Sequence, residues 1–170
     1  VGLNKRIEWL LVDICESFIV IASFVLGWLY QLNNKYIVGL NDVLSDRLKY
    51  IAQTMSTYNI KLWGQYIEEH GNGGSIIAKD NYFFIDNSFV RCMYEYGAIV
   101  FVLVIVLIFM AQKKMLDNEK YIMCLAFFIV TIASFAEHHL LEIAYNPFIF
   151  SVFACMSNND KVIMEEKRIC

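Results

Sequence analysis

Long apolar runs separated by polar segments dominate this sequence. The runs cover residues 9–30, 97–111, 121–136 and 140–156. A helix rises about 1.5 Å per residue and the hydrocarbon core of a bilayer is about 30 Å thick, so the first run is long enough to cross it. The pattern predicts an all-α, polytopic integral membrane protein with about four transmembrane helices at these positions.

Composition supports this class. Apolar residues make up 58% of the 170 residues, aromatics 15%, and there is a single proline. Mean hydropathy is +0.48, above the range of ordinary globular domains. The net charge of −3 comes without a cluster of Lys and Arg, which excludes a nucleic-acid partner. The five cysteines show no CxxC spacing, so they indicate neither a disulfide nor a cofactor.

Positive charges near the ends of the runs predict the topology. Lys5 and Arg6 precede the first run, Lys113 and Lys114 follow the second, and the polar tail 157–170 carries three more. With four spans all of these lie on one side, so that side and the tail are predicted to be cytoplasmic. Residues 31–96 then form a large extracytoplasmic loop. The chain begins at Val1 and has few spans, so we expect it to be the C-terminal part of a longer protein.

Two acidic residues interrupt the first run. Asp13 and Glu16 lie about one turn apart, near the end that carries Lys5 and Arg6. We expect both at the level of the lipid headgroups. A buried, functional carboxylate is the alternative.

The outer loop contains helical patterns. Leu44, Leu48, Ile51 and Met55 follow the spacing i, i+4, i+7, i+11, and Asn41 or Asp42 could cap such a helix. On this amphipathic helix Arg47 is the cation that leans toward the protein. Residues 61–69 predict a second short helix, and the glycine-rich segment 71–75 predicts a hinge.

A third amphipathic helix is predicted just before the second span. Asp86 or Asn87 can cap a helix that runs through Tyr96 and into the span. On it Arg91 and Glu95 are spaced i, i+4, which predicts an ion pair.

The last hairpin adds Glu137, His138, His139 and Glu142 on the same outer face. If residues 137–141 are helical, His138 and Glu142 share a face, as a general base and an orienting carboxylate would, or as a structural pair would. No third well-spaced histidine or cysteine completes a metal site, so we expect none. Arginine beside a base suits chemistry on a lipid-linked diphosphate, although the same groups could simply bind lipid headgroups.

Several short motifs occur in a characteristic order. They are Leu44-Ser45-Asp46-Arg47-Leu48, then Asp86-Asn87-Ser88-Phe89-Val90 with Tyr96-Gly97, and finally Glu137-His138-His139 with Asn146-Pro147. This order resembles the C-terminal half of the bacterial O-antigen, capsule and exopolysaccharide polymerases (Wzy-type), with the O-antigen ligases as more distant relatives. Asp46 stands where a glycine is common in the family, and Asp86 where ligases have histidine. Both differences favour polymerase over ligase.

The resemblance implies a multi-pass glycosyltransferase of the bacterial cytoplasmic (inner) membrane. It would join undecaprenyl-diphosphate-linked oligosaccharide repeat units outside that membrane, without a cofactor or metal, alongside a flippase and a chain-length regulator. Catalytic roles would fall to His138, Glu137 or Asp86. Substrate binding would fall to five further residues, namely Arg47, Asn87, Arg91, His139 and Glu142. The alternative is a non-catalytic membrane protein, either a transporter of lipid-linked oligosaccharide or a subunit whose outer loop binds a partner.

Overall fold

The computed structural model describes residues 5–70 and 82–142. The predicted hinge at 71–75, the fourth span beyond residue 142 and the tail 157–170 lie outside these residues. The elements are α1 (Lys5–Gln31), α2 (Lys35–Val43), α3 (Arg47–Thr57), α4 (Ser88–Arg91), the π-helix η2 (Cys92–Tyr96), α5 (Ala98–Asp117), α6 (Tyr121–Ala133) and the 3-10 helix η3 (His139–Leu141). An isolated bridge between His70 and Phe83 is the only β pairing among the described residues, so the all-α class is confirmed.

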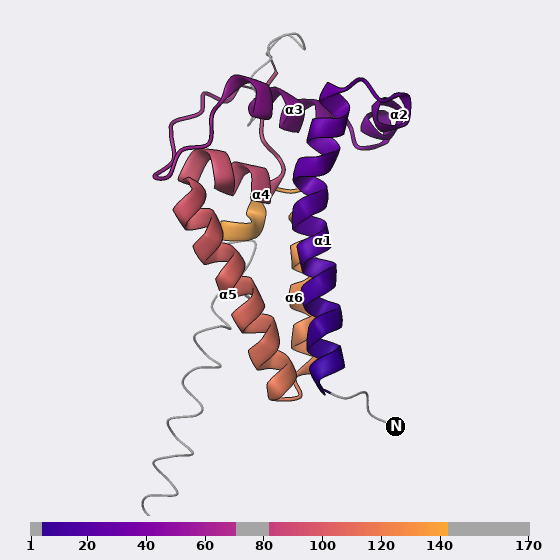
Figure 1. The fold of residues 1–170 in the computed structure, drawn as a ribbon, viewed down its shortest axis with the longest axis vertical. Helices are drawn as coiled ribbons and strands as arrows, with labels where there is room; N and C mark the ends of the chain where they lie inside the picture. Colours follow the sequence, from indigo (N-terminus) through magenta and orange to yellow (C-terminus); the bar gives the residue numbers. More distant parts are fainter. Residues whose placement is uncertain (1–4, 71–81, 143–170) are drawn as a thin grey trace, which may run out of the picture.

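Three long helices, α1, α5 and α6, lie side by side and alternate in direction (Figure 1). The start of α1 meets the end of α5, where Lys113 Nζ lies 4.9 Å from the centre of the Trp9 ring. At the other end of the bundle α2 and α3 lie across the end of α1, with α4 and η3 close by (Figure 1). The loop elements therefore gather at one end of the bundle.

Two of these helices, over Trp9–Gln31 and Ala98–Asp117, are long and apolar enough to cross a membrane. Much of their apolar surface points outward. Phe18 is 71% exposed, Leu10 59% and Leu103 57%. A helix at the centre of a soluble core would bury these side chains, so their exposure fits a lipid environment.

The interior consists of two apolar clusters. One fills the bundle with Phe89, Ile108, Met115, Phe127 and Leu140 among its buried members. The other packs the loop elements onto the bundle through Leu48, Ile51, Ile67, Phe83, Ile85, Val90 and Tyr94. Burying each large aliphatic or aromatic side chain contributes about 1.5–3 kcal/mol. The end of the bundle that holds the loop is therefore packed in its own right.

The second span is longer than predicted. We expected it to end at residue 111 with a polar turn after it, but α5 continues to Asp117. The reason is that Gln112, Met115 and Leu116 are buried against the rest of the bundle. Their packing continues the helix through a stretch that looks polar in the sequence. The turn to α6 is only Asn118–Lys120, and α6 ends at Ala133 rather than at residue 136.

The predicted helix at 61–69 is wrong. This segment is a non-helical strap that lies against the start of α5. Gln65 N donates to Glu95 O at 3.0 Å, and Ala98 N donates to Lys61 O at 3.0 Å. The backbones approach so closely that a Cβ on Gly97 would stand 2.3 Å from Gly64 N. Tertiary contact rather than local propensity decides this conformation.

The helix before the second span also differs from the prediction. It does not run on into the span, because Gly97 has φ +97° and separates η2 from α5. Likewise, the loop helix begins at Arg47, after the separate helix α2, rather than at Asn41 or Asp42. Asn41 instead accepts a bond from Lys49 N at 3.0 Å, in the first turn of α3.

Of the two interpretations of Glu16, the structure favours the buried carboxylate. Its side chain points into the bundle and is 1% exposed. Gln112 Nε2 of α5 donates to Glu16 Oε1 at 2.7 Å. Asp13 is half-buried and borders a shallow groove on the outer side of α1.

Candidate functional site

Asn87 joins the loop to the bundle. Its Oδ1 accepts from the backbone N–H groups of Phe89 (3.0 Å) and Val90 (2.9 Å), so it caps α4 as one of the two predicted candidates. Its Nδ2 donates to Ser23 Oγ of α1 at 3.0 Å and to Phe135 O at 2.8 Å. Because both amide hydrogens are used and the side chain is 1% exposed, Asn87 holds the site together rather than facing a substrate.

Ser88 fixes the segment that follows α6. Its backbone N–H donates to Ser134 O at 2.9 Å, and its hydroxyl donates to the carbonyl of Glu137. The same hydroxyl oxygen accepts from Leu140 N at 3.2 Å. This one residue therefore places Glu137 and the two histidines beside α4.

Arg47 lies between two carboxylates from distant parts of the chain. Its Nη2 is 3.1 Å from Glu137 Oε1, and its Nε is 3.5 Å from Asp86 Oδ2. Burial raises the pKa of Asp86 above its ordinary value, although the neighbouring Arg47 opposes this. The prediction that Arg47 leans toward the protein is confirmed.

Arg91 forms a second charge cluster. Its Nε is 2.8 Å from Glu95 Oε2, which confirms the predicted i, i+4 pair. Its Nη2 also binds Glu69, whose other oxygen accepts from Ile85 N at 2.9 Å. The guanidinium carbon lies 4.9 Å from the centre of the Phe84 ring. Burial raises the pKa of Glu69, while the Ile85 N–H and Arg91 act against that rise.

His138 and His139 share one carboxylate. Glu142 Oε1 is 3.3 Å from His138 Nε2, and Glu142 Oε2 is 3.3 Å from His139 Nδ1. The expected helix at 137–141 is reduced to the short η3, yet the His138–Glu142 pair still forms. The His138 ring also packs on Phe84 in a T-shaped arrangement, with centroids 5.0 Å apart.

Burial lowers the pKa of His138, with His139 and Arg91 as further causes, so its imidazole is neutral at neutral pH. His138 Nδ1 is buried and has no partner among the described residues. With Glu142 on Nε2, the pair can exchange a proton with a bound hydroxyl group.

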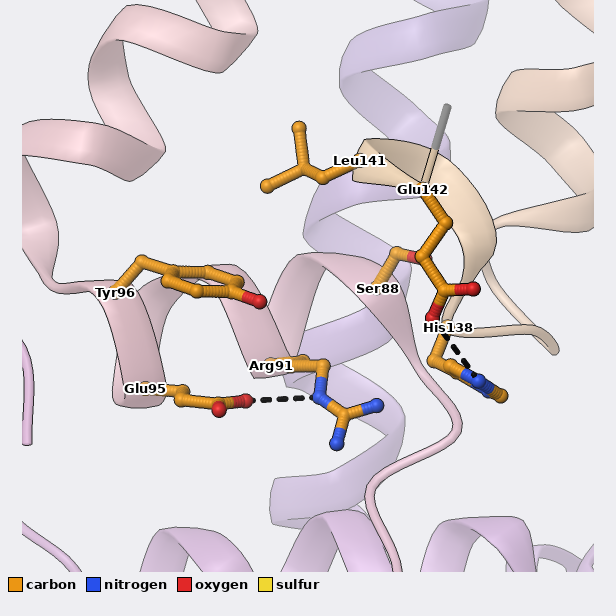
Figure 2. Close-up of a pocket in the computed structure, with 7 residues that line it drawn as sticks. All are labelled: Ser88, Arg91, Glu95, Tyr96, His138, Leu141 and Glu142. Carbon is orange, nitrogen blue, oxygen red and sulfur yellow. Dashed lines mark hydrogen bonds and ion pairs between the residues drawn. The ribbon is translucent and has the colours of Figure 1, made fainter. Parts of the chain in front are cut away.

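A pocket of about 220 Å³ opens between η2 and η3 (Figure 2). Arg91, Glu95 and Tyr96 form one side, and the His138–Glu142 pair faces them from the other. Most of its exposed lining is polar. The pocket therefore presents a guanidinium, carboxylates and an imidazole to whatever enters it.

The same segment offers ligands for a metal ion. Glu137, His138 and His139 each have one ligand atom within 4.8 Å of the others. Imidazole nitrogens and a carboxylate oxygen are ligands that Zn²⁺ accepts, although Glu142 and Arg47 already occupy these groups here.

The fold gathers the sequence-predicted site residues at one end of the bundle. The sequence did not reveal Glu69, which binds Arg91, or Phe84, whose ring contacts both Arg91 and His138. It also gave no role to Ser88. None of these contacts lies within one turn of helix, so periodicity carried no signal for them.

No protein-family model, curated protein or solved structure matches this chain.

Proposed function

We propose that this chain belongs to a multi-pass glycosyltransferase of the bacterial cytoplasmic membrane. It would join oligosaccharide repeat units carried on undecaprenyl diphosphate at the outer face. The observation that carries the proposal is the His138–Glu142 pair, which faces Arg91 across a polar pocket at one end of an apolar helical bundle. A site of this kind meets a substrate whose lipid tail lies in the membrane and whose sugars lie outside it.

The size of the pocket favours a sugar ring. At about 220 Å³ it is smaller than the roughly 300–1,000 Å³ of typical ligand pockets. It therefore suits one sugar residue rather than a whole repeat unit. Carboxylates such as Glu95 and Glu142 accept hydrogen bonds from sugar hydroxyls, and the Tyr96 ring offers an apolar face to the sugar.

In the proposed reaction a hydroxyl of the acceptor sugar attacks the anomeric carbon of the donor sugar. The hydroxyl proton passes to Nε2 of the neutral His138, and the imidazolium that forms is stabilised by Glu142 Oε1 at 3.3 Å. The bond between the anomeric carbon and the diphosphate oxygen breaks, and the diphosphate leaves with the electron pair. Arg47 and Arg91 would stabilise the charge on the diphosphate. Each would give up one of its carboxylate partners and bind phosphate oxygens instead. Asp86 and Glu137 hold Arg47 in place until then.

The test is chain-length analysis of lipid-linked glycan in cells that depend on this gene. We expect His138→Ala to slow chain extension by about 100- to 10,000-fold, so that single repeat units accumulate. We expect Arg47→Ala to do the same. The matched controls are His70→Ala and Lys49→Ala, which remove exposed side chains outside the site. Wild-type chain lengths in both site variants, with the protein inserted normally, would refute the proposal.

One observation favours the transporter as a second candidate. Glu16 is buried among the helices of the bundle, and buried ionisable groups are typical of substrate and ion pathways. If Glu16→Gln abolished the appearance of repeat units on the outer face, while leaving polymerisation of units already there intact, transport would be the better assignment.

A further inference from the structure

The helical bundle encloses a carboxyl group that the proposed site does not use. Glu16 lies on the inward side of α1, with Trp9 two turns before it and Ser23 two turns after it. It is 1% exposed and packs against α5 and α6. Both α1 and α5 are long and apolar enough to cross a membrane.

Glu16 has few hydrogen-bond donors around it. Gln112 Nε2 donates to Oε1 at 2.7 Å, while Oε2 is buried without a partner among the described residues. The Gln112 carbonyl accepts from Cys124 Sγ at 2.9 Å, which turns its NH₂ group toward Glu16. An ionised carboxylate has about four acceptor sites, and a buried one needs most of them filled.

The charges that face Glu16 do not compensate a negative charge either. On its own helix the charged group that acts on Glu16 is Asp13, which is acidic. From α5 the facing group is the neutral Gln112, and Lys113 lies over the Trp9 ring instead. From α6 they are the Cys124 thiol and the Thr131 hydroxyl.

Thr131 of α6 lies beside Glu16. Its hydroxyl donates to Phe127 O at 3.1 Å and makes no hydrogen bond to the buried Glu16 Oε2. Among the described residues, the Glu16 carboxyl therefore has one hydrogen-bond donor and no cation beside it.

We propose that Glu16 is a proton-binding site inside the bundle, with Gln112 as the donor to its carbonyl oxygen and the proton on its unpartnered oxygen. A buried carboxylate with no cation beside it is costly, so the proton is held at neutral pH. Ionisable groups among membrane helices commonly serve proton or ion movement. This inference does not depend on the glycosyltransferase assignment.

Infrared spectroscopy of the purified chain in lipid at neutral pH tests the protonation state directly. A protonated carboxyl has a carbonyl stretch that a carboxylate lacks. We expect this band in the wild-type chain and in Asp13→Asn, and its loss in Glu16→Gln. If the carbonyl-stretch band were the same in Glu16→Gln as in the wild type, the proposal would be overturned. This readout needs no reagent to reach the buried carboxyl.

Labelling with dicyclohexylcarbodiimide in membranes provides a second readout. The carboxyl proton passes to a reagent nitrogen, the oxygen adds to the central carbon, and an acyl shift gives an N-acylurea that keeps the whole reagent. We expect mass spectrometry to find this adduct on Glu16 and not on the half-exposed Glu142. When labelling is carried out at alkaline pH, the adduct on Glu16 should not form. Protection by sodium ions at constant pH would show that a metal cation occupies the site and would overturn the proposal.

Discussion

Asn87 and Ser23, 64 positions apart, are joined by a buried 3.0 Å hydrogen bond from Asn87 Nδ2 to Ser23 Oγ. This bond ties the loop that carries Arg91 to the first helix of the bundle. The same amide caps α4 and binds the chain after α6. The Asn87 side chain therefore joins three parts of the fold, and the position of the site depends on these bonds.

We expect Asn87→Ala to lower the free energy of unfolding by at least about 2 kcal/mol, because it removes a cap and leaves buried polar groups unpaired. The control is Asn34→Ala, which removes the exposed cap of α2 and should cost about 1 kcal/mol. A thiol-reactive dye that labels the buried Cys92 and Cys124 only on unfolding provides the measurement. Equal losses in both variants would contradict the central role of Asn87.

Gly97→Ala should release the strap at 61–69 from the start of α5. The new Cβ would stand 2.3 Å from Gly64 N, and φ +97° is a conformation that alanine rarely adopts. We expect faster trypsin cleavage after Lys61 than in the wild type. Gly39→Ala is the control, since no atom lies within 4 Å of its added Cβ and alanine favours helix by about 1 kcal/mol. Unchanged cleavage in Gly97→Ala would show that the strap does not need this close approach.

Arg47→Ala should destabilise the protein more at pH 7 than at pH 4.5. The pKa of Asp86 is already raised by burial, and loss of Arg47 raises it further. A raised pKa means that the folded state keeps a proton which the unfolded state has lost, so stability falls as pH rises through that window. We expect the loss to be larger at pH 7 by on the order of 1 kcal/mol.

Unfolding in denaturant at the two pH values measures this difference. The double variant Arg47→Ala, Asp86→Asn has no carboxyl at position 86, so most of the added pH dependence should vanish. If the pH dependence stays, it arises elsewhere.

For the reaction proposed above, the rate of chain extension should be maintained in mild acid. Burial lowers the pKa of His138 below its ordinary 6.5, so the neutral imidazole persists below that pH. The carboxylate of Glu142 opposes this lowering. We therefore expect Glu142→Gln to shift the acidic limb of the pH–rate profile to lower pH and to reduce the rate. A limb that moves upward would contradict this electrostatic account.

Thiol labelling can locate the membrane. Cys15 on α1 and Tyr66 on the strap are both exposed in the structure, and the buried Cys92 is unreactive because burial raises its pKa to about 12. In membranes we expect a charged maleimide to label Tyr66→Cys and not Cys15. The background carries Cys155→Ser and Cys170→Ser. Labelling of both positions would refute a lipid-covered α1.

Local patterns predicted much of the site. The Asn87 cap and the Arg91–Glu95 pair were visible in the sequence, because both involve residues within four positions of one another. Arg47 was correctly placed toward the protein by the apolar stripe of its helix. The strap at 61–69 was missed, because its conformation depends on contact with Gly97 rather than on its own residues.

The sequence by itself determined the helical class and the approximate positions of the three long helices, since apolar runs longer than about ten residues favour helix over strand. The tertiary structure decided which polar groups meet. Arg47 and Glu137 are 90 positions apart, and Glu16 and Gln112 are 96 apart. Such contacts leave no periodic signal, because they depend on how the helices pack. That packing turned Glu16 inward and brought Glu69 to Arg91.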